Sequence, residues 1–435
     1  MTGLLGREFQ AERMPTVRKF LFTLALILGL SSNAWAMRTP VFGSGTPSTS
    51  ATNYAGFYSA FVASNDTTVR NISPITGIIE GLYVVANTAP GSGKSYTLTI
   101  QKNGADTSVT CTISDLSTSC SDSTHAVLMS AADTYSIKSV PSGTPSSSRL
   151  NFSTIFNSMT GGPSIMPMGI NSTTPSASVT DNSAITGRTT WNQSGAVDIS
   201  PTSGTFGNFY VLGVTAPGSG KSFAFTVQKN STGTTLTCTV SDLSTSCSDT
   251  SHSFSVVAGD TLRIQSVPSG TPTSTTYTFG MTFTPTIDGE SFTSYTYGGG
   301  SPSNTADSYA GINFAAASAT STEANHSNVI PLGGFTAKKI YYSAGSAPGS
   351  AKSFTASLRI NGSTSSLSCI NSGSGGVFCQ DSINAVSLSS LDIVNFMLSP
   401  SGTPTASSSN RISVVFYIDP NDHIYGGTLY GSKIN

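Results

Sequence analysis

The chain has 435 residues, of which only 9% are charged, and its formal net charge is −1. Soluble domains average about 25% charged residues, so Ser, Thr, Asn and Gly must supply most of the polar surface. The basic residues are scattered and form no stripe, which argues against a nucleic-acid partner. With 22 Phe and 15 Tyr the chain is too aromatic for intrinsic disorder.

The N-terminus has the features of a secretory signal peptide. Arg18 and Lys19 precede the apolar run from Phe20 to Leu30, and Ala34-Trp35-Ala36 matches a signal-peptidase site. We therefore predict that residues 1–36 are a signal peptide, with Met14 as an alternative start. The run is short for a permanent span, and a membrane-anchoring helix is the alternative interpretation. The mature protein is expected outside the cell, at its surface or in the periplasm.

The rest of the chain repeats one unit three times. Its copies are roughly 130 residues apart, which is the length of a domain and too long for a solenoid repeat. Two motifs define the period: TAPGSGKS at 88–95 and 215–222, altered to SAPGSAKS at 346–353, and SVPSGTP at 139–145 and 266–272, altered to LSPSGTP at 398–404. We predict domains at 37–160, 161–288 and 289–420, followed by a tail at 421–435.

Hydrophobic residues in each copy alternate with polar ones, as expected for half-buried strands. Tyr96, Leu98 and Ile100 show this period of two, and Asn103-Gly104 follows as a hairpin turn. The alternation recurs at Phe223, Phe225 and Val227, at Phe354, Ala356 and Leu358, and in late strands around Leu150–Phe152, Tyr277–Phe283 and Ile412–Ile418. No helical periodicity follows residue 37. The pattern predicts an all-β chain of three tandem β-sandwich domains resembling jelly rolls.

The six cysteines fall as one pair in each copy. The pairs are Cys111 with Cys120, Cys238 with Cys247, and Cys369 with Cys379. An even count in an exported chain indicates disulfides, and pairing within a copy lets each copy fold alone. The alternatives are a redox or a metal site. The spacing matches neither C-x-x-C nor a zinc pattern, and no His follows at ligand distance.

The sequence Gly91-Ser92-Gly93-Lys94-Ser95 is similar to a phosphate-binding loop but lacks parts of it. Thr88 and Thr215 stand where that motif needs its first Gly, and Ala351 replaces a Gly in the third copy. A phosphate-binding loop must also begin a helix, whereas a strand pattern follows here. We interpret the segment as a turn and predict no nucleotide.

The four histidines are His125, His252, His326 and His423. His125 and His252 occupy equivalent positions, where the third copy has Asn384. A catalytic or metal-binding role would need clustered partners, and the neighbours are Ser, Thr and a nearby Asp. We interpret the histidines as polar loop residues.

Asp122, Asp249 and Asp381 each follow the second Cys of their copy by two positions. Their recurrence predicts a shared turn in which the carboxylate accepts hydrogen bonds from backbone amides. Calcium binding is the alternative, although it needs several oxygen ligands together. The richer cluster Asp419-Pro420-Asn421-Asp422 is also interpreted as a turn. We find no acid–base pair and no nucleophile motif, and we expect no cofactor, no metal and no enzymatic activity.

The order of features in each copy resembles the C1q/TNF-like jelly rolls. The resemblance covers the apolar strand Ile78 to Val85, the strand and turn at 96–104, the segment Gly259-Asp260-Thr261-Leu262-Arg263-Ile264 and the aromatic strand 277–283. All three copies also resemble uncharacterised Ser/Thr-rich domains of bacterial surface proteins and phage virions, which have similar Pro-Gly-x-Gly-Lys-Ser turns. Because C1q/TNF-like domains usually trimerise, that resemblance implies that three copies in one chain pack as a trimer-like unit.

Three functions remain open. The first is a secreted structural or adhesive surface protein, which self-associates through open strand edges or through a strand donated by residues 424–430. The second is a carbohydrate-binding protein, for which Trp191 is the only Trp outside the signal peptide. The third, a secreted hydrolase, lacks a recognisable catalytic constellation.

Overall fold

The structure is a computed structural model that describes residues 37–58, 62–159, 162–168, 173–186, 191, 197–296, 301–312, 321–406 and 409–419. Regular structure in these residues is β-strand, apart from two short 3-10 turns at Asp66–Thr68 and Glu323–His326. The predicted all-β class is confirmed. The predicted signal peptide and the C-terminal tail lie outside the described residues. The described part of the chain contains no helix that is long and apolar enough to cross a membrane.

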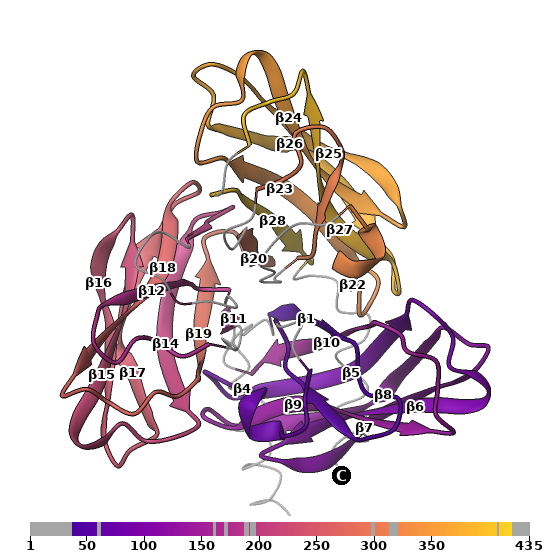
Figure 1. The fold of residues 1–435 in the computed structure, drawn as a ribbon, viewed down its shortest axis with the longest axis vertical. Coiled ribbons are helices and arrows are strands. Elements are labelled where there is room, and N and C mark those ends of the chain that lie inside the picture. The colour runs from indigo at the N-terminus through magenta and orange to yellow at the C-terminus, as the bar shows by residue number, and fades with distance from the viewer. Residues whose placement is uncertain are drawn as a thin grey trace, which may run out of the picture. The chain divides into compact units, whose positions relative to one another are not determined.

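Strands β1 to β10 form the first sandwich, coloured indigo to violet in Figure 1. Their bounds are β1 Arg38–Gly45, β2 Asn53–Ala55, β3 Val62–Ala63, β4 Asn71–Ile72, β5 Gly77–Ala86, β6 Gly91–Lys102, β7 Ala105–Asp115, β8 Ser119–Met129, β9 Thr134–Ser142 and β10 Leu150–Ser158. One sheet has the order β1-β10-β5-β8. The other has the order β3-β2-β9-β6-β7, with β4 also paired to β9.

The second sandwich repeats this plan with sheets β11-β19-β14-β17 and β12-β18-β15-β16. Its strands are β11 Ser164–Met168, β12 Asp181–Ala184, β13 Asp198–Ile199, β14 Gly204–Gly213, β15 Gly218–Lys229, β16 Thr232–Asp242, β17 Ser246–Val256, β18 Thr261–Ser269 and β19 Tyr277–Pro285. The short strand β13 pairs with β18, as β4 pairs with β9 in the first sandwich.

The third sandwich has sheets β20-β28-β23-β26 and β21-β27-β24-β25, with β22 paired to β27. Its strands are β20 Glu290–Thr296, β21 Ser308–Ala310, β22 Asn328–Val329, β23 Phe335–Ser343, β24 Gly349–Ile360, β25 Ser363–Gly373, β26 Phe378–Leu388, β27 Ile393–Ser401 and β28 Arg411–Tyr417.

This strand order is that of a jelly roll. All pairings are antiparallel, and the first long strand of each copy lies beside the last, as β1 lies beside β10, β11 beside β19 and β20 beside β28. From β5 onward the chain crosses between the two sheets at every connection except the β6–β7 hairpin. The ends of each copy are therefore joined by a full strand pairing, which closes each sandwich on itself.

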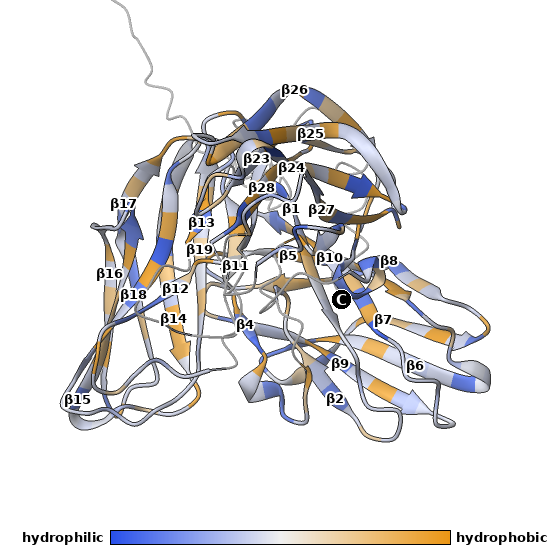
Figure 2. Cartoon of the chain, turned by 45° about the horizontal axis from the view of Figure 1, so that its top comes forward, coloured by the Kyte–Doolittle hydropathy of each residue, from blue (hydrophilic) through white to orange (hydrophobic). Residues whose placement is uncertain are grey.

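The predicted alternation decides which side chains enter each core. Tyr96, Leu98 and Ile100 on β6 are fully buried, while Thr97 and Thr99 point to the opposite face of the sheet. Figure 2 shows the same alternation of apolar and polar residues along the strands of all three sandwiches. Each core is a continuous cluster of aliphatic and aromatic side chains, so burial of this face is the main stabilising contribution.

Hydroxyl groups cover the outer face of the β6–β7 sheet. The hydroxyls of Thr97 and Thr112 lie 2.9 Å apart, as do those of Thr99 and Thr110. The second sandwich repeats the pair with Thr226 and Thr237, at 3.0 Å. Cross-strand Thr pairs of this kind stabilise a sheet, and they explain how a chain with so few charges has a polar surface.

The three sandwiches contact one another in a cycle within the single compact unit formed by residues 36–435. The short strand β4 of the first sandwich packs on β19 of the second, β13 of the second packs on β28 of the third, and β22 of the third packs on β10 of the first. These three contacts use equivalent strands. A Cβ atom on Gly280 would lie 2.6 Å from the carbonyl oxygen of Ile72, which shows how closely β4 approaches β19.

Candidate functional site

The two motifs that define the repeat pack against each other at one corner of each sandwich. The amide of Ser146 donates a 2.8 Å hydrogen bond to the carbonyl of Pro90, and a Cβ atom on Gly143 would lie 2.8 Å from the carbonyl oxygen of Gly93. Gly93 itself has a positive φ of 69° and donates its amide to the carboxylate of Asp115. The segment opens no helix, but Gly91 to Ser95 belong to strand β6 and do not form the predicted turn. The pairing of β6 with β7 shifts between Gly91 and Ser95, so the segment is an irregular start of that strand. Its recurrence has a packing cause.

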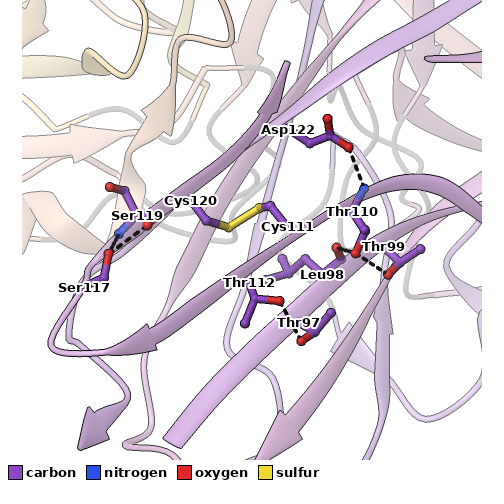
Figure 3. The surroundings of a disulfide bond; sticks show 10 residues. All are labelled: Thr97, Leu98, Thr99, Thr110, Cys111, Thr112, Ser117, Ser119, Cys120 and Asp122. Atoms are coloured by element: carbon purple, nitrogen blue, oxygen red, sulfur yellow. Dashed lines mark hydrogen bonds between the residues drawn. A yellow bond between two sulfur atoms is a disulfide. The ribbon is translucent and has the colours of Figure 1, made fainter. Parts of the chain in front are cut away.

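The cysteines of each copy form one disulfide, which links the two sheets. Cys111 on β7 bonds to Cys120 on β8, and the two Cα atoms are 5.8 Å apart (Figure 3). Equivalent bonds join Cys238 to Cys247 and Cys369 to Cys379. Because β7 and β8 belong to different sheets, each bond fixes the edge where the sandwich would otherwise open.

Asp122, beside this disulfide, organises a bulge in strand β8. Its carboxylate accepts hydrogen bonds from the backbone amides of Thr124 and His125 and, across the strands, of Thr110, at 3.0–3.2 Å. Figure 3 shows the Asp122 side chain directed at Thr110. Although burial raises the pKa of Asp122, the hydrogen bonds from these amides lower it below its usual range. The predicted hydrogen bonds from backbone amides are present, but they lie in a bulge within strand β8 and not in a turn. The pattern recurs at Asp249 and Asp381.

The recurrent histidines complete these bulges. His125 Nδ1 lies 2.9 Å from Asp122 Oδ2, and His252 Nδ1 lies 3.0 Å from Asp249 Oδ2. In the third copy Asn384 Nδ2 makes the same contact with Asp381, at 2.9 Å. An amide therefore replaces the imidazole without loss of the hydrogen bond. A shared structural role accounts for both residue types.

The other candidate residues are dispersed. His326 is buried at the junction of the third and first sandwiches, where burial and the positive charge of Arg149 lower its pKa to about 4. His423 and most of the Asp419–Asp422 segment lie outside the described residues. Trp191 is only 8% exposed and packs on Phe225 and Phe279, so it presents no face to a sugar. No group of three or more potential metal ligands occurs in the part of the chain that is described.

Sequence reasoning missed a charged cluster at the junction of the second and third sandwiches. Glu290 is fully buried, and its Oε1 lies 3.0 Å from Lys338 Nζ and 2.5 Å from Lys339 Nζ. Thr202 of the second sandwich donates its hydroxyl to the same carboxylate. Burial raises the pKa of Glu290, but the hydrogen bond from Lys339 and the other donors lower it below its usual range.

A β-bulge explains why two successive lysines reach one carboxylate. Lys339 has a positive φ of 57°, and the pairing of β23 with β26 shifts between Lys338 and Ile340. The shift interrupts the alternation that would send the two side chains to opposite faces. The sequence did contain a signal for this cluster: the two lysines are absent from the equivalent positions of the other two copies.

A cleft of about 470 Å³ opens at the junction of the first and second sandwiches. Arg70 and Ile72 line it from the first sandwich, and Tyr210, Leu212 and residues around Cys247 line it from the second. Its size lies in the range of small-molecule sites. Sequence analysis could not have located it, because its walls come from two different copies.

Comparisons with known proteins leave the family open. No family model matches the chain, and no curated protein matches it. Among solved structures, the one described as "Structure of PNGF-II in C2 space group" is 7% identical, covers 61% of this chain and 67% of its own, and has a TM-score of 0.20. A similarity this low supports no conclusion about fold or function.

Proposed function

We propose that the chain is a secreted, non-enzymatic structural or adhesive protein of the cell surface. Its working unit is one chain whose three disulfide-bonded sandwiches contact one another in a cycle. The cycle of equivalent contacts, β4 on β19, β13 on β28 and β22 on β10, carries this proposal.

Such a unit suits attachment because it presents three related surfaces at fixed positions. Repeated weak contacts from linked modules raise the overall avidity by orders of magnitude without any tight individual site. The outer faces carry paired threonine hydroxyls, which are able to form many hydrogen bonds. Disulfides in every copy suit an oxidising, extracellular setting.

The most conspicuous recurrent polar residues support a non-enzymatic role. The carboxylates of Asp122, Asp249 and Asp381 are each occupied by backbone amides from the same bulge and the neighbouring strand. Their only close side-chain base, where one is present, is the imidazole that completes that bulge. These residues recur because the fold needs them.

The test uses residues 37–435 produced in an oxidising compartment and coupled to inert beads. Attachment of the beads to mucin-coated or cell-derived surfaces is measured under flow. We expect several-fold more beads to attach than in a control in which the beads carry the reduced and alkylated chain. Negative-stain electron microscopy of the free protein tests the structural version, in which it forms regular arrays or filaments. If the protein shows no attachment and also forms no ordered assembly, the proposal is contradicted.

Carbohydrate binding is the second candidate. The cleft at the first junction favours it, because this site combines a tyrosine, aliphatic side chains and hydroxyl groups, as saccharide sites do. A glycan array probed with the mature chain tests it, and signals at background level for every glycan would exclude it.

A further inference from the structure

The cleft between the first and second sandwiches contains an arginine that has no anionic partner among the described residues. Arg70 precedes β4 and is the only charged residue that lines the cleft. Its Nε is buried and has no hydrogen-bond partner among the described residues. By contrast, Arg38 and Arg359 pair with Glu80 and Glu323. A partly buried guanidinium gains most from a carboxylate or a similar planar anion.

A second, smaller cavity is also lined by Arg70 and by one more polar side chain that is unpaired among the described residues, that of Thr278. It measures about 10 Å³ and is lined by Arg70, Tyr277 and Thr278, among others. Thr278 Oγ1 is buried without a hydrogen-bond partner among the described residues, like Arg70 Nε, whereas the Tyr277 ring packs on Phe223 and Phe225 in the core of the second sandwich. A space of this size holds about one water molecule. Such a water would link Arg70 to the second sandwich and hold the guanidinium at the base of the cleft.

This combination occurs at one junction only. The residues that precede β13 and β22, and so match Arg70, are Val197 and Ser327. The tyrosines that match Tyr210 are Tyr341 and Tyr83, which are 7% and 6% exposed, whereas Tyr210 is only partly buried. Among the described residues, the first junction therefore combines an arginine with a partly exposed tyrosine, and the equivalent positions of the other two junctions do not.

The lining determines the kind of ligand. Tyr210 and Leu212, both partly exposed, supply apolar surface, and Ser246 and Ser248 add exposed hydroxyl groups. A sugar ring has an apolar face of C–H groups and an edge of hydroxyls, and it stacks on a tyrosine by that face. We propose that the cleft binds a short anionic saccharide, two or three rings long, whose carboxylate or sulfate pairs with Arg70. This site rests on the adhesive function proposed above and names its ligand class.

The test is isothermal titration calorimetry of residues 37–435 with three oligosaccharides. The charged groups of tri-galacturonate are all carboxylates, those of a carrageenan tetrasaccharide are all sulfates, and cellotriose has no charged group. We expect at least one charged probe to bind, more weakly at 300 mM than at 50 mM salt, and cellotriose to bind at least tenfold more weakly. The charged probe that binds identifies the anion. Equal binding of cellotriose would contradict the proposal.

Two variants locate the site. Arg70→Gln should weaken binding of the charged probe at least tenfold, while Lys94→Gln, which removes one positive charge outside the cleft, should leave it unchanged. Ser246→Trp places an indole in the cleft from an exposed position and should abolish binding without lowering the melting temperature.

Wild-type affinity in R70Q would overturn the assignment. Loss of saccharide binding in R70Q with bead attachment intact would leave the site established and show that adhesion uses other surfaces. Absence of binding by every probe, with attachment retained, would refute the site and leave the adhesive function standing.

Discussion

At the scale of single residues, the recurrent polar positions are explained by backbone hydrogen bonds. Asp249 illustrates the point, because its carboxylate accepts hydrogen bonds from the amides of Ser251, His252 and Thr237. In a bulge these amides are not paired by the regular hydrogen bonds between strands. A buried amide without an acceptor costs free energy. Asp therefore recurs where the chain needs a compact, doubly accepting side chain, and the following His or Asn orients it.

The variant Asp249→Asn should lower the free energy of unfolding by about 1–3 kcal/mol, because one acceptor oxygen becomes an NH₂ group facing backbone amides. Thermal and urea unfolding measure the change. His252→Asn is the matched control, since Asn384 already does the same work in the third copy, and we expect a change within about 0.5 kcal/mol. A D249N variant as stable as the wild type would refute the bulge-organising role.

Glu290 holds two lysines of its own sandwich at the junction with the second sandwich, where Thr202 also donates to it. Glu290→Gln should lower the free energy of unfolding by about 2–3 kcal/mol, because Lys338 and Lys339 then meet at one site without a counter-charge. This loss of stability is smaller than for a fully buried ion pair, because the side chains of Lys338 and Lys339 are still 23% and 21% exposed. Denaturant unfolding measures it. A double variant that also replaces both lysines with Met should recover part of the loss, and no recovery would contradict the pairing.

At the scale of elements, each disulfide joins neighbouring strands of different sheets across a short loop. Replacing Cys238 and Cys247 together by Ser should lower the free energy of unfolding by about 2–3 kcal/mol, because the unfolded chain regains the freedom of a loop with a sequence separation of 9. Unfolding of the double variant under oxidising conditions measures this. A reductant should then destabilise the variant less than the wild type. An equal effect would show that this bond contributes little.

At the scale of the whole molecule, the contact between the third and first sandwiches closes the cycle. The first and second junctions each join sandwiches that are consecutive in the chain, whereas this one depends on non-covalent contacts such as the hydrogen bond from Asn87 to the carbonyl of Ala324. The ring of Phe42 also lies 5.6 Å from that of Phe416 across this junction. The mature chain should therefore elute with the mass of one chain in size-exclusion chromatography with light scattering.

Acid should weaken this closing junction through His326. Its folded-state pKa of about 4 lies below the ordinary 6.5 because of burial and the charge of Arg149, so the unfolded chain binds the proton first. The stabilisation is complete above pH 6.5 and falls by up to about 3 kcal/mol as the pH drops toward 4. Urea unfolding between pH 7 and 4 measures the slope, which His326→Asn should flatten. An unchanged slope in that variant would exclude His326 as its source.

The amino-acid sequence by itself determined the β class, the three copies and the side chains of each core. These properties are local: Tyr96, Leu98 and Ile100 alternate with polar residues whatever strands they later pair with, and recurrent motifs mark equivalent positions. The hydrogen bonds from backbone amides to Asp122 were also predictable, because they depend on neighbours within the same copy.

Only the tertiary structure decided which strands are neighbours and how the copies meet. A period of two identifies a buried face but not the partner strand, so the order β1-β10-β5-β8 could not be read from the pattern. Glu290 meets Lys339 from a distant strand of its own sandwich and Thr202 from another, and Arg70 meets a different copy of the repeat at the cleft. Their contacts span long stretches of chain, and no local pattern encodes them. The cleft beside Arg70 lies where two sandwiches meet through strands β4 and β19, so it exists only in the assembled chain.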